Sequence, residues 1–100
     1  MDYIDVVKTF AKSTGYSTQT VGNKYVWLNV AKTRKVVQNS RDIRIKVSPH
    51  VDVRAGAHDF DVRHEITVDA YDDTRRIDTY VFSPEEFSED VLREIVLVWE

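Results

Sequence analysis

The sequence contains no cysteine, and only three of its 100 residues are glycine and two are proline. The missing cysteine excludes disulfides, thiolate metal sites and cysteine nucleophiles. The glycines at 15, 22 and 56 are isolated, so they cannot form a glycine-rich phosphate-binding loop. The longest apolar run, Ile95 to Trp99, is far too short to cross a membrane. With 42% apolar and 31% charged residues, the composition is typical of a folded globular domain.

The length and the even composition predict a single domain over residues 1–100. We find no internal repeat, no low-complexity tract and no linker rich in glycine, serine or proline. The N-terminal stretch carries Asp2 and Asp5 and lacks an apolar core, so it is not expected to be a signal peptide. The expected location is therefore the cytoplasm, without a membrane partner.

The chain begins with a pattern typical of an amphipathic helix over residues 2–14. Its apolar residues recur at helical spacing and form one stripe. Asp2 can cap the start of the helix, and Gly15 fits the left-handed position just after its end. The stripe consists of Tyr3, Ile4, Val7, Phe10 and Ala11.

Alternating apolar and polar residues then predict a series of antiparallel strands. Gly22 and Asn23 suit a two-residue hairpin turn, and residues 54–61 are expected to form a loop. Pro49 cannot donate to a ladder, so its strand should lie at an edge or be bulged or broken there. The expected strands are 16–21, 24–31, 35–38, 42–53, 62–71 and 75–82.

The chain ends in a second amphipathic pattern. Ser83, Pro84 and Glu86 form a capping-box sequence, which predicts that the last helix begins there. The β-rich residues 91–99 leave a terminal strand as the alternative. The apolar stripe of this helix is Phe87, Val91, Leu92, Ile95, Val96 and Trp99. The sequence thus predicts an α+β fold, with an antiparallel β-sheet of four to six strands and N- and C-terminal helices packed on one face.

Strand alternation also assigns side chains to the two faces of the sheet. His64 falls in the inward set and is interpreted as a neutral, hydrogen-bonded core histidine. The inward set is Val26, Leu28, Val30, Ile43, Ile45, Val47, Val51, Val53, Val62, His64, Ile66, Val68, Ala70, Ile77, Thr79 and Val81. The outward set includes Tyr25, Trp27, Arg44, Lys46, Arg63, Tyr71, Arg76, Tyr80 and Phe82.

The outward set is the strongest candidate for a binding surface. Aromatic residues and arginine are the types that anchor protein interfaces, and they also stack bases in open-sheet RNA binders. The alternatives are that a second layer or a second copy buries these side chains, or that they lie scattered. The candidate binding residues are Tyr25, Trp27, Arg44, Lys46, Arg63, Tyr71, Arg76 and Tyr80.

Charge is unevenly distributed along the chain, although the formal net charge is only −3. Residues 32–50 contain six lysines and arginines but one acid, whereas residues 84–100 contain six acids but one arginine. These segments could serve different contacts, or they could lie side by side in the fold and neutralise each other.

Residues suited to catalysis or metal binding are present but poorly spaced. The densest polar cluster could bind zinc, manganese or iron, but strand parity and the lack of a preorganised histidine pair argue against convergence. Its members are His50, Asp52, His58, Asp59, Asp61, His64 and Glu65. Asp52 and Glu65 resemble the acid pair of metal-dependent nucleases, yet Thr67 stands where those sites usually have lysine. No serine lies in a nucleophile elbow.

Three functions follow from these patterns. The preferred hypothesis is a non-enzymatic protein-binding module (an adaptor, chaperone or inhibitor) that uses the outward face, needs no cofactor and could form a homodimer. A single-stranded RNA or DNA binder is the alternative, which the acidic net charge disfavours. A small metal-dependent enzyme using His50, Asp52, His58 and Glu65 is the second alternative.

Overall fold

A computed structural model describes residues 2–22, 24–32, 42–55 and 60–99, except for the side chains of 31–32, 42, 52–55 and 60–63. Within these ranges the chain forms two helices and five strands. Their bounds are α1 Tyr3–Thr14, β1 Ser17–Val21, β2 Tyr25–Lys32, β3 Asp42–Ala55, β4 Phe60–Asp72, β5 Arg75–Phe82 and α2 Glu89–Trp99. The strand expected at 35–38 lies outside the described residues.

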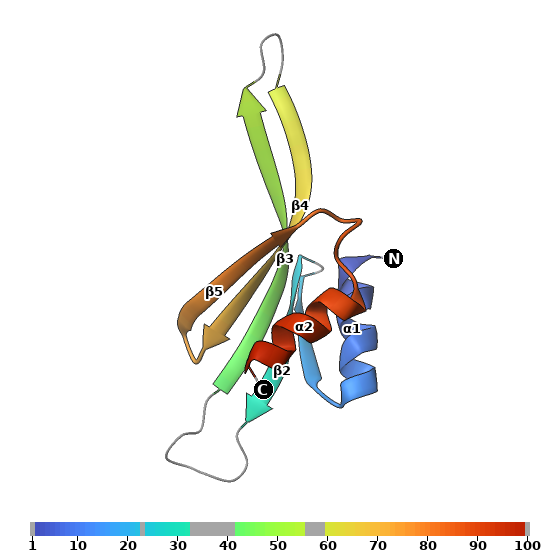
Figure 1. Cartoon of the computed structure of the whole chain (residues 1–100), viewed down its shortest axis with the longest axis vertical. Helices are drawn as coiled ribbons and strands as arrows, with labels where there is room; N and C mark the ends of the chain where they lie inside the picture. The colour runs from blue at the N-terminus through green and yellow to red at the C-terminus, as the bar shows by residue number, and fades with distance from the viewer. Residues whose placement is uncertain (1, 23, 33–41, 56–59, 100) are drawn as a thin grey trace.

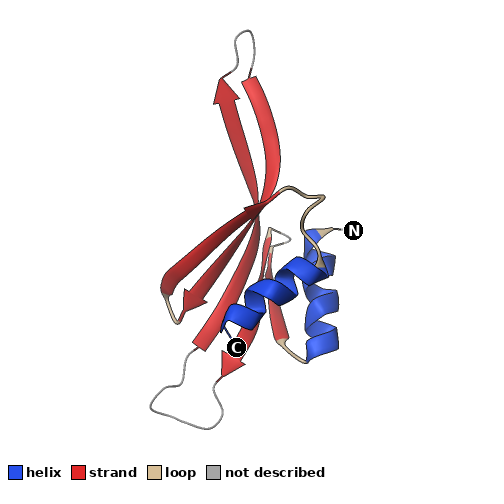
Figure 2. Cartoon of the chain, viewed as in Figure 1, coloured by secondary structure: helices blue, strands red, loops and turns tan. Residues whose placement is uncertain are grey.

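The strands form one antiparallel sheet in the order β1-β2-β3-β4-β5, so each strand pairs with its neighbours in sequence. Both helices lie on the same side of this sheet (Figures 1 and 2). Helix α1 packs on β1, β2 and β3, while α2 packs on α1 and β2. The predicted α+β fold is confirmed. We call the sheet face opposite the helices the open face.

The core lies between the helices and the sheet. It contains the apolar residues of β2, β3 and β4 that their alternation with polar residues predicted to face inward. Val26, Leu28, Ile45 and Val47 are fully buried, and Leu92 of α2 closes the core from the helix side. The terminal residues 91–99 form a helix, and the strand alternative is wrong. The buried apolar set is Ile4, Val6, Val7, Phe10, Ala11, Val26, Leu28, Val30, Ile43, Ile45, Val47, Ile66, Val68, Ala70, Phe87, Leu92, Ile95 and Val96.

Helix α1 matches its prediction closely. Phe10 is buried at the centre of its stripe, and Gly15 ends the helix with φ at 84°, a left-handed conformation that glycine adopts without a Cβ clash. Asp2 occupies the N-cap position, but its side chain makes no capping hydrogen bond. The hydroxyl of Tyr3 donates to the carbonyl of Lys24, which ties the start of the helix to the β1–β2 turn.

The start of α2 corrects the sequence prediction. The capping box forms, because Glu86 N–H donates to Ser83 Oγ at 3.3 Å and Ser83 N–H donates to Glu86 Oε1 at 3.1 Å. These bonds close a separate turn, and the helix itself begins at Glu89. Ser88 sits just before it and accepts from the Val91 N–H at 3.4 Å, as an N-cap does.

This turn predicts a small pH dependence of stability. Its hydrogen bonds to the Ser83 side chain and backbone lower the pKa of Glu86 below its usual 4.5. A lowered folded-state pKa adds stability above the unfolded pKa, and that contribution is lost as the pH falls through the folded pKa. Glu86→Gln keeps the acceptor but cannot ionise. Urea unfolding should therefore show wild type ahead of Glu86→Gln at pH 6, with the gap closing below about pH 4; a constant gap would contradict this.

Strand β5 also differs from prediction, because a bulge reverses its faces. Ile77 has no Cα partner, since Arg76 pairs with Tyr71 and Asp78 pairs with Ala70. Beyond the bulge, Tyr80 pairs with Val68 and so lies on the helix side, where it packs against the core. The outward placements of Tyr80 and Phe82 and the inward placements of Thr79 and Val81 are wrong. The physical reason is the extra residue, which shifts the alternation by one position.

The outer parts of β3 and β4 leave the body of the molecule as a two-stranded arm (Figure 1). Strand β2 pairs with β3 only as far as Val47, so at Pro49 β3 is bonded to β4 alone. Pro49 therefore lies at a free edge, as its missing N–H requires. The expected loop over 54–61 is too long, because Arg54, Ala55, Phe60 and Asp61 belong to the strands.

Helix length explains why the arm is uncovered. Helix α1 has 12 residues and α2 has 11, which at 1.5 Å per residue gives about 18 Å at most. Strand β3 has 14 residues, or roughly 46 Å. Val51 is consequently 52% exposed and His64 is exposed. The predictions that Val51 lies in the core and that His64 is a core histidine are wrong.

Candidate functional site

The open face is a grid whose rows follow directly from strand register. Antiparallel Cα partners point to the same side of a sheet, so a row of successive partners runs across the strands on one face. Rows one and two are Ser17–Asn29–Arg44–Tyr71–Arg76 and Gln19–Trp27–Lys46–Asp69–Thr79, and the described members of row three are Val21–Tyr25, Ser48–Thr67 and Val81. No helix of the described chain covers this grid (Figure 2).

Trp27 lies at the centre of an aromatic cluster on this face. Its ring centroid is 5.2 Å from that of Tyr71 and 6.4 Å from that of Tyr25, and both pairs meet edge to face. Edge-to-face pairs at these distances are favourable beyond the area that they bury. All three rings are only partly buried. The cluster is therefore a formed platform that still presents apolar surface to solvent.

Arg44 is held in place beside this cluster. Its guanidinium carbon lies 4.6 Å from the Trp27 ring centroid, and its Nη2 donates to the Asp73 carbonyl at 2.9 Å. Its Nε is buried without an acceptor among the described residues. A guanidinium carries five N–H donors, so this anchored side chain keeps donors that a carboxylate of a partner could use.

Lys46 and Asp69 occupy the central row together. The Lys46 ammonium lies 4.4 Å from the Tyr25 ring centroid and 5.8 Å from that of Trp27. Asp69 is only 7% exposed and accepts a hydrogen bond from Thr79 Oγ1 at 2.8 Å. The Asp69 carboxylate therefore accepts a hydrogen bond from within the sheet, whereas the Arg44 and Lys46 side chains lie against aromatic rings.

Six of the eight predicted binding residues come together on the open face. They are Tyr25, Trp27, Arg44, Lys46, Tyr71 and Arg76. Tyr80 does not, because the bulge turns it to the helix side, where its hydroxyl donates to Asp78 Oδ2 at 2.8 Å. Burial and this carboxylate raise the pKa of Tyr80. Arg63 lies opposite Asp52 in the arm, and its side chain is outside the described residues.

Asp69 and Thr79 were not singled out from the sequence. Alternation assigns Asp69 to the outward face of its strand but gives no sign that it is buried. Its pairing with Thr79 depends on the bulge, which moves Thr79 from the inward to the outward face. In the sequence, Asp69 stands between the apolar residues Val68 and Ala70. Any exposed residue of an alternating strand has such neighbours, so this position does not indicate burial.

The basic residues of the open-face rows and the acids of α2 lie on opposite sides of the sheet. In the three rows of the open face, Arg44, Lys46 and Arg76 oppose Asp69 alone. The acids Glu89, Asp90 and Glu94 belong to α2, in the helix layer behind the sheet (Figure 1). Arg44 and Lys46, the members of the basic segment whose side chains are described, therefore lie on the side of the sheet away from these α2 acids, and the rows of the open face keep a local positive charge.

The residues considered for metal chemistry do not assemble. His50 and Glu65 are Cα partners at the base of the arm, while the Asp52 side chain and His58 lie outside the described residues. No group of three or more metal-binding side chains occurs within the described ranges.

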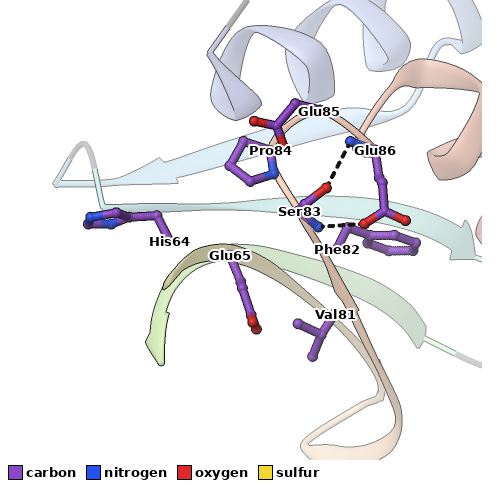
Figure 3. A pocket seen from close by; sticks show the side chains of 8 residues that line it. All are labelled: His64, Glu65, Val81, Phe82, Ser83, Pro84, Glu85 and Glu86. Atoms are coloured by element: carbon purple, nitrogen blue, oxygen red, sulfur yellow. Dashed lines mark hydrogen bonds between the residues drawn. The ribbon is translucent and has the colours of Figure 1, made fainter. Parts of the chain in front are cut away.

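An open pocket of about 510 Å³ lies where β4 and β5 meet the turn before α2. Figure 3 shows His64 and Glu86 at opposite ends of it, with Glu65 directed away from both. Glu86 is also engaged with the Ser83 N–H. These side chains do not converge on one point, so the pocket offers no preorganised acid–base pair or ligand set.

Among the described residues, no helix is long and apolar enough to cross a membrane. Comparison of the chain with protein-family models, with curated proteins and with solved structures finds no significant match, so its function is argued from the open face alone.

Proposed function

We propose that this chain is a non-enzymatic protein-binding module, an adaptor, chaperone or inhibitor, whose open face takes an acidic surface of another protein. The observation that carries this proposal is the Trp27 cluster, in which three partly exposed rings lie beside cations held against them. Aromatic residues and arginine at the centre of a patch are the usual anchors of protein interfaces.

Charge complementarity selects the partner. Arg44, Lys46 and Arg76 give the rows of the open face an excess of positive charge over Asp69, although the whole chain is acidic. An acidic partner is attracted to this face and repelled by the acids of α2 on the other side. The two sides of the molecule thus favour one docking orientation.

The same contacts favour a protein over a single-stranded nucleic acid. A base stacks on a ring only where a ring face is free. Here Arg44 lies over the Trp27 ring and Lys46 lies over the Tyr25 ring. Base stacking would have to displace these cations, whereas a carboxylate can reach them where they are.

The proposal is tested by capture from native lysate, with and without nuclease, followed by direct binding of each recovered protein to the purified chain. The test pair is wild type and Tyr25→Ala/Trp27→Ala. The matched control is Leu97→Ser, which changes a 61% exposed residue on α2. We expect an acidic protein that survives nuclease, binds wild type and Leu97→Ser directly, and is lost with the double variant.

Three results would overturn this proposal. Partners that are lost after nuclease treatment would indicate that the open face binds nucleic acid instead of protein. A partner that binds the folded double variant as well as wild type would remove the open face from the contact. A direct affinity that does not fall with added salt would contradict the charge argument, because exposed charge pairs are screened.

A further inference from the structure

Three features fix the Arg44 side chain in one position on the open face. Its guanidinium carbon lies 4.6 Å from the Trp27 ring centroid. Its Nη2 donates to the Asp73 carbonyl at 2.9 Å, and its Nε is buried. Because the ring, the backbone acceptor and the burial of Nε each restrict the side chain, Arg44 has little rotamer freedom left to lose when a partner binds.

The Asp73 carbonyl belongs to the tight turn between β4 and β5. Asp72 pairs with Arg75, so Asp73 and Thr74 form a two-residue turn. Asp73 has a φ of 59°, the left-handed conformation that such turns require and that aspartate adopts more readily than most residues. The acceptor of the Arg44 hydrogen bond is therefore a backbone group whose place is set by strand pairing.

The donors that remain on Arg44 match a carboxylate. A guanidinium carries five N–H groups, arranged so that two of them can meet both oxygens of one carboxylate. Since Nε is buried and one N–H of Nη2 is bonded to Asp73, the remaining donors are on the terminal nitrogens of this partly exposed side chain. The Lys46 ammonium, which lies over the Tyr25 ring, is instead a point charge without a fixed direction.

We propose that Arg44 determines the specificity of the open face, by binding one carboxylate of a glutamate or aspartate side chain of the partner through its terminal N–H groups. This inference rests on the proposed function and names the chemical group that the partner must supply. Lys46 attracts the same acidic surface but does not select the geometry of the contact. Trp27 supports the contact, because its ring is one of the groups that hold the guanidinium.

The two tryptophans of the chain can report on this contact without the partner. Trp27 lies beside Arg44 on the open face, whereas Trp99 belongs to α2 in the helix layer. The probe is an acetylated triglutamate amide, with the matching triglutamine peptide as its control, titrated at constant ionic strength. In a nitrogen–proton correlation spectrum, triglutamate should shift the Trp27 indole N–H signal and leave that of Trp99 in place. Triglutamine should shift neither signal.

Substitutions separate the paired donors of Arg44 from its charge. Arg44→Lys keeps the charge but loses a hydrogen bond, so the affinity for triglutamate should fall about fivefold or more. Arg44→Lys/Lys46→Arg keeps the composition of wild type but moves the arginine along β3, and it should bind as weakly as Arg44→Lys. The matched control is Arg93→Lys, because Arg93 also lies over a ring, 5.7 Å from the Phe10 centroid, but on α2. It should bind triglutamate as wild type does, and an unchanged Trp99 signal verifies the fold of each variant.

Four results would overturn this inference. They are wild-type affinity for triglutamate in Arg44→Lys, wild-type affinity in Arg44→Lys/Lys46→Arg, equal shifts of Trp27 and Trp99, and tighter binding of inorganic phosphate than of triglutamate. These results differ from a failure of the proposed function. A captured acidic protein that depends on Trp27 but tolerates Arg44→Lys would keep the proposed function and remove this inference. A triglutamate contact that weakens in Arg44→Lys, together with a captured protein that binds Tyr25→Ala/Trp27→Ala as well as wild type, would support the carboxylate contact and contradict the proposed function.

Discussion

Trp27→Ala is expected to weaken partner binding by about 30-fold or more. Trp27 lies in the central row of the open face and contacts Tyr25, Tyr71 and Arg44. Truncating a central aromatic anchor typically costs about 2 kcal/mol or more, which corresponds to this loss of affinity. Removing the indole also frees the Arg44 guanidinium from the ring that positions it. Isothermal titration with the captured partner measures the change directly.

Two variants separate this effect from a general loss of structure. Trp27→Phe keeps a ring under Arg44 and should lose less affinity than Trp27→Ala. Leu97→Ala, on the helix side, should bind as wild type does. The core lies on the other face of the sheet, so Trp27→Ala should keep the fold, which circular dichroism can verify. A folded Trp27→Ala with wild-type affinity would show that the open face does not make the contact.

The second large effect concerns stability. Leu92→Ala is expected to lower the free energy of unfolding by about 2–5 kcal/mol, the cost of a buried leucine and the cavity that it leaves. Leu92 is fully buried in α2, a helix that packs on α1 and β2. A domain of this kind has about 5–15 kcal/mol in total, so the variant loses a large fraction of its stability. Urea unfolding at constant pH measures the change.

The control for Leu92 lies five residues away on the same helix. Leu97→Ala removes the same atoms from a side chain that is 61% exposed, and it should change stability by less than about 0.5 kcal/mol. Ile95 is also in the core, whereas Val91 is only partly buried, so Val91→Ala should cost less than Ile95→Ala. Equal effects at 92 and 97 would mean that α2 does not pack as described.

The sequence predicted the central strands because each has one clearly apolar face. Ile43, Ile45 and Val47 alternate with Arg44 and Lys46, so a slip of one residue would bury charge. This is why most of the open face could be assigned in advance. Strand β5 lacks such contrast. Thr79 and Val81 on one parity are balanced by Tyr80 and Phe82 on the other, so either face could be buried.

The other predictions that were wrong depend on features that the alternation of apolar and polar residues does not reveal. The bulge at Ile77 contains no glycine or proline to mark it. The pattern that placed Val51 inward is correct about the face but says nothing of what covers it, since coverage depends on the lengths of helices elsewhere in the chain. The capping box at Ser83 formed its hydrogen bonds, yet the helix began only at Glu89, after Ser88 supplied a second cap.

The meander has a consequence for the order of folding. Every described strand pairs with its sequence neighbours, so the contacts of the sheet are local in sequence and can form early. The contact between α1 and α2 is different, because it joins the first and last elements of the described chain. Closing so long a loop costs entropy that few contacts repay at first. The interface between α1 and α2 should therefore form after the folding transition state, on a sheet that has already formed. Mutations in this interface should change the unfolding rate of the protein more than its folding rate.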